Sequence, residues 1–176
     1  TLKRDILLIK NLPLPDSIAT PRNNLSNVGE TTNFARCQAI INQYLGEMVA
    51  YEAEGNGHLF QDMVPSESLK NTQTSLGSSI ELELHTEQAF SKLKPDYLCL
   101  GCIKGDPMAK TYYYHVKDII NEISFDSLML LGEDRWNIGV DLSFTMNGCK
   151  GKKRGPLPIY KNGNLIFDQD LMEGID

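Results

Sequence analysis

Polar and apolar residues alternate most clearly between Ile80 and Gln88. Because successive side chains of a strand point to opposite faces, this alternation predicts a strand with one apolar and one polar face. The apolar face carries Ile80, Leu82 and Leu84. The polar face carries Glu81, Glu83, His85 and Glu87. Side chains two positions apart on such a strand are separated by roughly 6–7 Å along the backbone, so neighbouring polar groups can converge on one ligand.

Short apolar runs elsewhere predict further strands. These cover residues 6–9, 58–64, 96–103, 111–116, 135–144, 156–160 and 165–167. Apolar residues at helical spacing predict one helix from Thr32 or Asn33 to about Met48, and a second over 117–123. The small and polar stretch 71–79 is typical of a loop or lid. Many short strands with few helices favour a β-rich α+β fold, either a sandwich or a jelly roll with helical additions.

Composition narrows the function classes. The chain has 176 residues, of which 41% are hydrophobic and 23% charged, and this fits one globular domain. A net charge of −6 argues against a general nucleic-acid surface. No apolar run approaches the roughly 20 residues of a membrane span, and the first residues do not resemble a signal peptide. We therefore expect neither a nucleic-acid nor a membrane partner.

The four cysteines are Cys37, Cys99, Cys102 and Cys149. Cys99 and Cys102 have the Cys-x-x-Cys spacing of zinc knuckles and redox sites. No second pair completes a zinc site, and the odd spacing would place the two thiols on opposite faces of the predicted strand 96–103. We expect buried free thiols and, from them, a cytoplasmic location.

His85 and Glu87 are the candidate metal ligands. A histidine and a carboxylate on one strand face make two-thirds of the 2-His-1-carboxylate triad of non-haem Fe(II) oxygenases. A solvent-facing strand that happens to carry a histidine and glutamates is the competing interpretation. The only other histidines are His58, on the strand before the lid, and His115, on the strand 111–116.

A series of motifs resembles one family along nearly the whole chain. They are the stretches 57–65, 73–78, 81–90 (Glu-Leu-Glu-Leu-His-Thr-Glu-Gln-Ala-Phe) and 95–97, followed by 139–144, 154–156 and 167–174. In this order they resemble the clavaminate synthase-like group of Fe(II)/2-oxoglutarate oxygenases. That group includes asparagine, arginine and lysine hydroxylases that act on free amino acids.

The resemblance implies a fold and an extent. The expected fold is a double-stranded β-helix (jelly roll) with flanking helices, and residues 1–176 would form a single, partial oxygenase domain. In the family a second iron-binding histidine, followed by an arginine that pairs with 2-oxoglutarate, lies near the end of the domain. Because no such segment precedes Asp176, we expect a chain truncated at both ends.

The resemblance also implies site residues. His85 and Glu87 match the first two Fe(II) ligands, and glutamate at the second position is typical of this branch. Thr111 matches a threonine that binds the distal carboxylate of 2-oxoglutarate, although an ordinary strand threonine is the alternative.

Substrate contacts follow in the same way. Gln73 and Ser75 match positions that contact the amino-acid substrate. Asp141 is the candidate partner for a substrate ammonium or guanidinium, with a solvated loop carboxylate as the alternative.

Two functions are compatible with the sequence. The first is an Fe(II)/2-oxoglutarate-dependent dioxygenase that uses molecular oxygen to hydroxylate a free L-amino acid, releasing succinate and CO2. Asp141 and the acidic charge favour a basic amino acid, while asparagine and a small peptide-like metabolite stay open. The second is a non-catalytic remnant or partial jelly roll that binds a partner or a metal weakly, because a two-ligand site would hold iron poorly.

Overall fold

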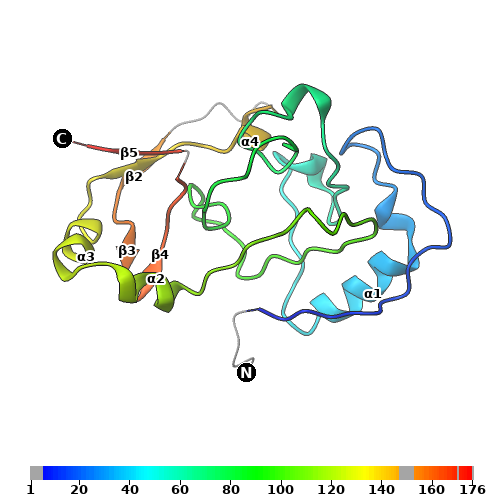
Figure 1. Cartoon of the computed structure of the whole chain (residues 1–176), viewed down its shortest axis with the longest axis horizontal. Coiled ribbons are helices and arrows are strands. Elements are labelled where there is room, and N and C mark those ends of the chain that lie inside the picture. Colours follow the sequence, from blue (N-terminus) through cyan, green and yellow to red (C-terminus); the bar gives the residue numbers. More distant parts are fainter. Residues whose placement is uncertain (1–5, 147–152, 170, 176) are drawn as a thin grey trace.

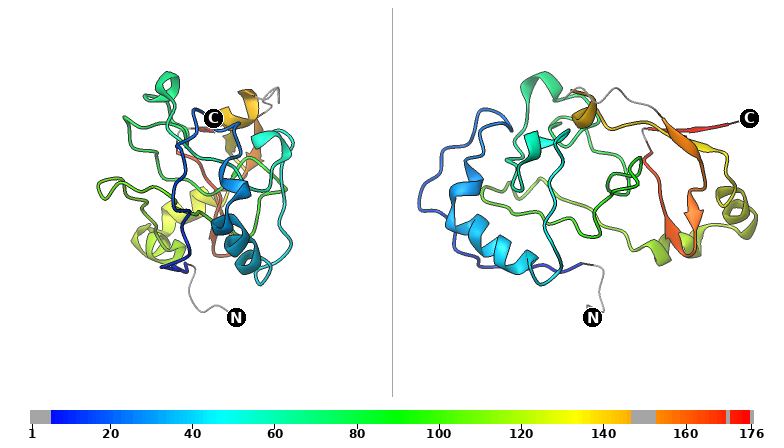
Figure 2. Two further views of the ribbon diagram at one scale, coloured as in Figure 1. Left: turned by 90° about the vertical axis from the view of Figure 1, so that its right-hand side faces the viewer. Right: turned by 180° about the vertical axis from the view of Figure 1, so that it is seen from behind.

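The computed structural model describes residues 6–146, 153–169 and 171–175. Four α-helices are present in these residues: α1 (Asn33–Asn42), α2 (Val116–Glu122), α3 (Phe125–Leu131) and α4 (Leu142–Met146). The strands are β1 (Trp136–Ile138), β2 (Arg154–Leu157), β3 (Tyr160–Lys161), β4 (Asn164–Leu165) and β5 (Met172–Gly174). The strands, α2 and α3 lie at one end of the molecule and α1 at the other, with long extended segments between them (Figures 1 and 2).

The strands form two antiparallel sheets. The larger sheet has the order β2-β1-β5, with Trp136 opposite Gly174 and Ile138 opposite Met172. The smaller sheet is the hairpin β3-β4, whose turn residues Asn162 and Gly163 have φ of 53° and 78°. Asn-Gly at a two-residue hairpin turn suits these positive φ values and the twist of the strands.

The two helices expected from the sequence are present, because the signals that start them are local. The Thr32 side chain accepts a hydrogen bond from the Ala35 N–H (3.1 Å), so the predicted start of α1 is confirmed. Its predicted end at Met48 is wrong. The helix stops at Asn42 and turns lead into Gly46, a poor helix former. The second helix, expected over 117–123, is α2.

Most of the predicted strands are not strands in the described residues. Segments 6–9, 58–64, 81–88, 96–103 and 111–116 have no ladder of hydrogen bonds to a neighbouring segment, and such a ladder is what makes an extended chain a strand. Within 81–88 one isolated bridge joins His85 to Asp168. The apolar face predicted there is not buried, since Leu82 and Leu84 remain 44% and 38% exposed. The predicted strand 135–144 is divided into β1 and α4.

The core lies beside the segment that carries His85 and Glu87. Ala89, Ile138 and Leu157 are buried together, with four partly buried neighbours around them: Phe90, Ile166, Leu171 and Met172. Ala89 is only 1% exposed, so the backbone just after Glu87 is held in the interior.

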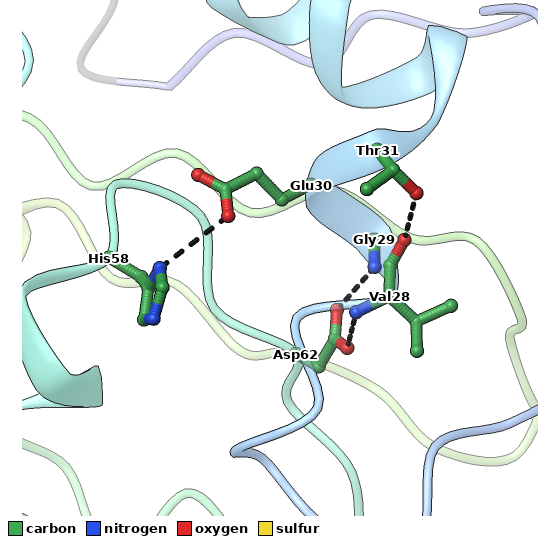
Figure 3. Close-up of polar contacts among 6 residues, drawn as sticks. All are labelled: Val28, Gly29, Glu30, Thr31, His58 and Asp62. Carbon is green, nitrogen blue, oxygen red and sulfur yellow. Dashed lines mark hydrogen bonds and ion pairs between the residues drawn. The ribbon is translucent and has the colours of Figure 1, made fainter.

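A cluster of polar residues holds the segment before α1 in place (Figure 3). The Asp62 carboxylate accepts hydrogen bonds from the backbone N–H groups of Val28 (2.6 Å) and Gly29 (2.9 Å). His58 Nδ1 lies 3.5 Å from Glu30 Oε2 in the same cluster. His58, one of the two remaining histidines, therefore contacts the segment before α1.

Three cysteines lie in the described residues, and all three are free thiols. Cys37 and Cys99 are partly buried, but Cys102 is exposed, so the expectation of buried thiols is wrong for Cys102. Cys149 lies outside the described residues. Among the described helices, none has the length and apolar character needed to cross a bilayer.

Candidate functional site

A pocket of about 90 Å³ brings together five of the six site residues expected from the sequence. They are Gln73, Ser75, His85, Glu87 and Asp141. Thr111, the sixth, is exposed and is not among the residues that line this pocket. Residues far apart in the chain thus meet in one pocket, and their roles in binding a metal and a substrate stay predictions from the resemblance.

His85 is oriented by a backbone carbonyl. Its Nδ1 lies 2.8 Å from the carbonyl oxygen of Glu83. A carbonyl oxygen only accepts hydrogen bonds, so Nδ1 carries the proton and donates it. Nε2 then has a free lone pair, and a neutral imidazole held this way is a typical metal ligand.

Two side chains hold the segment around Glu87 in place. The Thr86 hydroxyl donates to the Phe167 carbonyl (3.2 Å) and accepts from the Phe167 N–H (3.1 Å). Arg154, at the start of β2, donates from Nη1 to the carbonyls of Ala89 and Ser91, each at 3.0 Å. The backbone before Glu87 is therefore held by Phe167, which follows β4, and the backbone after Glu87 is held by Arg154 in β2.

We expect Thr86→Val to destabilise the protein by about 1–3 kcal/mol, because the part-buried Phe167 N–H loses its acceptor. For a chain of this size each kcal/mol corresponds to about 2–4 °C in Tm. Valine keeps the branched shape, and Thr86→Ser, which keeps the hydroxyl, is the matched control. Calorimetry of both variants checks the prediction. An unchanged Tm for Thr86→Val would contradict it.

The pocket is strongly acidic. Five carboxylates line it: Glu54, Glu83, Glu87, Asp141 and Asp168. Within the part of the chain that the structure describes, no lysine or arginine lines the pocket. Such a site repels anions and attracts cations, whether a metal ion or an ammonium group.

Burial raises the pKa of Glu87 above its ordinary value. The neighbouring His85 lowers this pKa, whereas Asp141 and Asp168 raise it further by repulsion. A cation bound beside Glu87 would relieve both the burial cost and the repulsion. Binding of a cation and ionisation of Glu87 therefore favour each other.

Glu54 is the pocket carboxylate that lies outside all of the sequence motifs. Burial raises its pKa, and repulsion from Glu87 and then from Asp141 raises it further. Hydrogen bonds from the Ser143 hydroxyl and the Gln88 amide, both at 3.3 Å, act in the opposite direction. Glu54 immediately precedes the Gly55–Gly57 turn, and its local sequence resembles that of any exposed acidic turn.

We expect Glu54→Gln to stabilise the protein at pH 8 but not at pH 4.5. The folded state raises the pKa of Glu54 above the ordinary 4.5, so it binds the proton more tightly than the unfolded state does. The cost of ionised Glu54 is thus fully present above the raised pKa, decreases as the pH falls through that pKa, and is small by pH 4.5. Because Glu54 is only partly buried, solvent screens part of this cost, and we expect a gain of at most about 1 kcal/mol, which raises Tm by about 2–4 °C.

The measurement is Tm as a function of pH for metal-free protein. Glu52→Gln, at an exposed glutamate two residues away, is the matched control and should show no comparable gain. A gain for Glu54→Gln that does not depend on pH would contradict the assignment.

Gln73 and Asp141, two further residues expected from the sequence, have hydrogen bonds to nearby parts of the chain. Gln73 Nε2 donates to the Glu81 carbonyl and Gln73 Oε1 accepts from the Glu83 N–H, both at 3.0 Å. Asp141 Oδ1 accepts from the Ser143 N–H (2.7 Å) and from the Ser143 hydroxyl (2.6 Å), where α4 begins. Both side chains thus support the backbone of the pocket. Asp168, which also lines the pocket, lies within the 167–174 motif, but the sequence pattern assigns it no role.

His85 and Glu87 suit Fe(II) as two of its ligands, because this metal takes imidazole nitrogen and carboxylate oxygen. Among the described residues there is no group of three histidine, cysteine, aspartate or glutamate side chains arranged to hold a metal ion. The fit to iron thus rests on the nature of this pair and on the acidic pocket around it.

Comparison with known proteins finds similar sequences among amino-acid hydroxylases and related oxygenases. It is 48% identical over 177 aligned positions to an L-lysine 3-hydroxylase of Catenulispora acidiphila, covering 96% of this chain and 49% of the relative. It is 27% identical to clavaminate synthase 2 of Streptomyces clavuligerus, covering 94% of this chain and 54% of the relative. The chain thus spans about half the length of these curated relatives. No protein-family model matches it.

A solved structure shares the fold. It is an asparagine oxygenase in complex with Fe(II), (2S,3S)-3-hydroxyasparagine and succinate, with a TM-score of 0.75 and 25% identity. The match covers 94% of this chain and 53% of that one. Together with the motifs around His85 and Glu87, these similarities identify the family. The chain belongs to the clavaminate synthase-like Fe(II)/2-oxoglutarate oxygenases.

Proposed function

We propose that the protein is an Fe(II)/2-oxoglutarate-dependent dioxygenase that hydroxylates a free basic L-amino acid. The observation that carries this proposal is the acidic pocket, which combines His85 and Glu87 with Gln73, Ser75 and Asp141. The similarity to an enzyme named L-lysine 3-hydroxylase supports the same substrate class.

In this proposal His85 Nε2 and the Glu87 carboxylate hold the iron. When bound, Fe(II) and 2-oxoglutarate supply the activation of molecular oxygen, with release of succinate and CO2. The chain itself orients His85 through the Glu83 carbonyl and fixes the Glu87 backbone through Thr86 and Arg154. Because His85 must be neutral and Glu87 anionic to bind iron, affinity for the metal should fall at acid pH.

The substrate is bound through its positive charges. A basic amino acid carries an α-ammonium and a second cation on its side chain, and Glu54, Asp141 and Asp168 offer carboxylates in one pocket. Charge-assisted hydrogen bonds from ammonium groups to these carboxylates would offset the repulsion among them. Gln73 and Ser75, at the side of the pocket formed by the 71–79 loop, complete the proposed substrate contacts.

We also infer a double-stranded β-helix built around the two antiparallel sheets, with residues 1–176 as part of a single oxygenase domain. The similarity to the asparagine oxygenase structure supports this fold. Thr111 is proposed to bind the distal carboxylate of 2-oxoglutarate, from a position outside the lining of the present pocket.

The test is a panel of free L-amino acids incubated with the protein, Fe(II), 2-oxoglutarate and oxygen. Succinate formation and a product heavier by one oxygen atom are measured together. We expect lysine or arginine to be hydroxylated and asparagine and glutamate to be poor substrates. Preferred turnover of asparagine would contradict the assignment of a basic substrate.

A binding function without turnover is the second candidate. The observation that favours it is that the described residues include no third metal ligand beside His85 and Glu87. The same panel separates the two candidates, because a binding protein would take up lysine without forming succinate.

A further inference from the structure

Three aromatic rings pack together beside the acidic pocket. The Phe144 ring lies edge-on to Phe90, with centroids 5.0 Å apart, and is tilted against Tyr51 at 6.0 Å. These three residues are called the aromatic cluster below. Phe90 and Phe144 also line the pocket itself, so the cluster forms one of its walls.

Each ring stands three positions from a pocket carboxylate. Tyr51 precedes Glu54, Phe90 follows Glu87, and Phe144 follows Asp141. The three segments come from distant parts of the chain, one before the Gly55–Gly57 turn, one in the 81–90 motif and one in α4. The ring contacts within the cluster connect the same three segments that deliver the carboxylates.

Polar contacts reinforce two sides of this arrangement. The Tyr51 hydroxyl donates to the Leu93 carbonyl (2.5 Å), which ties its segment to the chain just after Phe90. The Ser143 hydroxyl, which donates to Asp141 at 2.6 Å, also lies 3.3 Å from a Glu54 carboxylate oxygen, so α4 contacts the segment of Tyr51. Phe144 itself is 7% exposed, so its ring is enclosed by the segments it joins.

The carboxylates need such a restraint. Glu54, Glu87 and Asp141 line one pocket, where like charges repel, and without a bound cation that repulsion favours moving their segments apart. Aromatic pairs at these separations stabilise a fold beyond the apolar area that they bury. Such contacts therefore act against the repulsion between the carboxylates.

We propose that the aromatic cluster sets the spacing of Glu54, Glu87 and Asp141, and that Phe144 is a positioning residue for the binding of a cationic amino acid. The ring of Phe144 touches both other rings, so its loss releases all three segments at once. The part that concerns the amino acid rests on the proposed function. The part that concerns the spacing of the carboxylates does not.

The first test compares two equally buried phenylalanines in the iron- and 2-oxoglutarate-loaded protein. Phe34 in α1 is also 7% exposed and does not line the pocket, so Phe34→Leu is the matched control for Phe144→Leu. We expect Phe144→Leu to raise KM for L-lysine at least tenfold with kcat changed less than threefold. Phe34→Leu should lower Tm by a similar amount and leave KM unchanged. Phe144→Tyr, which keeps the ring, should restore KM.

The second test needs no substrate. The gain in Tm produced by Glu54→Gln at pH 8 is measured in wild-type, Phe144→Leu and Phe34→Leu backgrounds. If Phe144 holds the carboxylates close together, this gain should be at least halved in Phe144→Leu and unchanged in Phe34→Leu.

The outcomes separate the two claims. Equal gains in all three backgrounds would overturn the positioning role, whatever the substrate is. A wild-type protein that neither binds nor turns over a basic amino acid would overturn the proposed function, and the second test would still decide whether the cluster positions the carboxylates. An equal change in KM for Phe144→Leu and Phe34→Leu would overturn the specific role of Phe144 in binding.

Discussion

Replacement of His85 with alanine should abolish succinate formation with every amino acid in the panel. The loss should exceed about 10³-fold, or roughly 4 kcal/mol of transition-state stabilisation. The variant removes the imidazole and leaves Glu87 among carboxylates alone, where it cannot hold iron in a defined geometry. Fold stability should change little, because His85 is exposed and its bridge to Asp168 is made by the backbone.

The control for this prediction is Glu81→Ala. Glu81 lies on the same predicted strand face but does not line the pocket, and its contact with Gln73 is made by the backbone carbonyl. Glu81→Ala should therefore retain activity within a few-fold of wild type. Succinate formation by His85→Ala at the wild-type rate would defeat the assignment of His85 as a metal ligand.

Features that depend on a few neighbouring residues could be predicted from the sequence. The cap at Thr32 and the position of α2 are local, and both are present in the structure. The strands could not be predicted in the same way, because a strand requires hydrogen bonds to a partner that the sequence pattern does not identify. Leu82 and Leu84 show this: they alternate as a strand should, yet they remain exposed without a ladder.

The same distinction between local features and tertiary contacts applies to the residues of the candidate site. His85 and Glu87 are two residues apart, and side chains at that spacing point to the same face of an extended chain. The sequence alone was therefore sufficient to predict that they lie side by side. Glu54 reaches the pocket only through tertiary contacts with Gln88 and Ser143, and no local pattern reveals such contacts. Thr111, which the resemblance selects, lies outside the pocket lining of the described structure, and its role in binding 2-oxoglutarate stays a prediction.

Asp141→Asn should raise KM for L-lysine about tenfold, equivalent to about 1.4 kcal/mol, with little change in kcat. Asp141 has two possible roles, and this substitution separates them. Its Oδ1 accepts two hydrogen bonds from Ser143 where α4 begins, and an asparagine oxygen can accept the same bonds. What asparagine lacks is the negative charge that would bind a substrate ammonium in the pocket.

Asp141→Ala is the companion variant because it removes the charge and the acceptor together. We expect it to raise KM as Asp141→Asn does and, in addition, to lose about 1 kcal/mol of stability through the start of α4. Thermal unfolding and steady-state kinetics on the two variants therefore report different quantities. If Asp141→Asn left KM unchanged while Asp141→Ala lowered Tm, Asp141 would act on the backbone alone. The cationic group of the substrate would then have to be bound by Glu54 and Asp168.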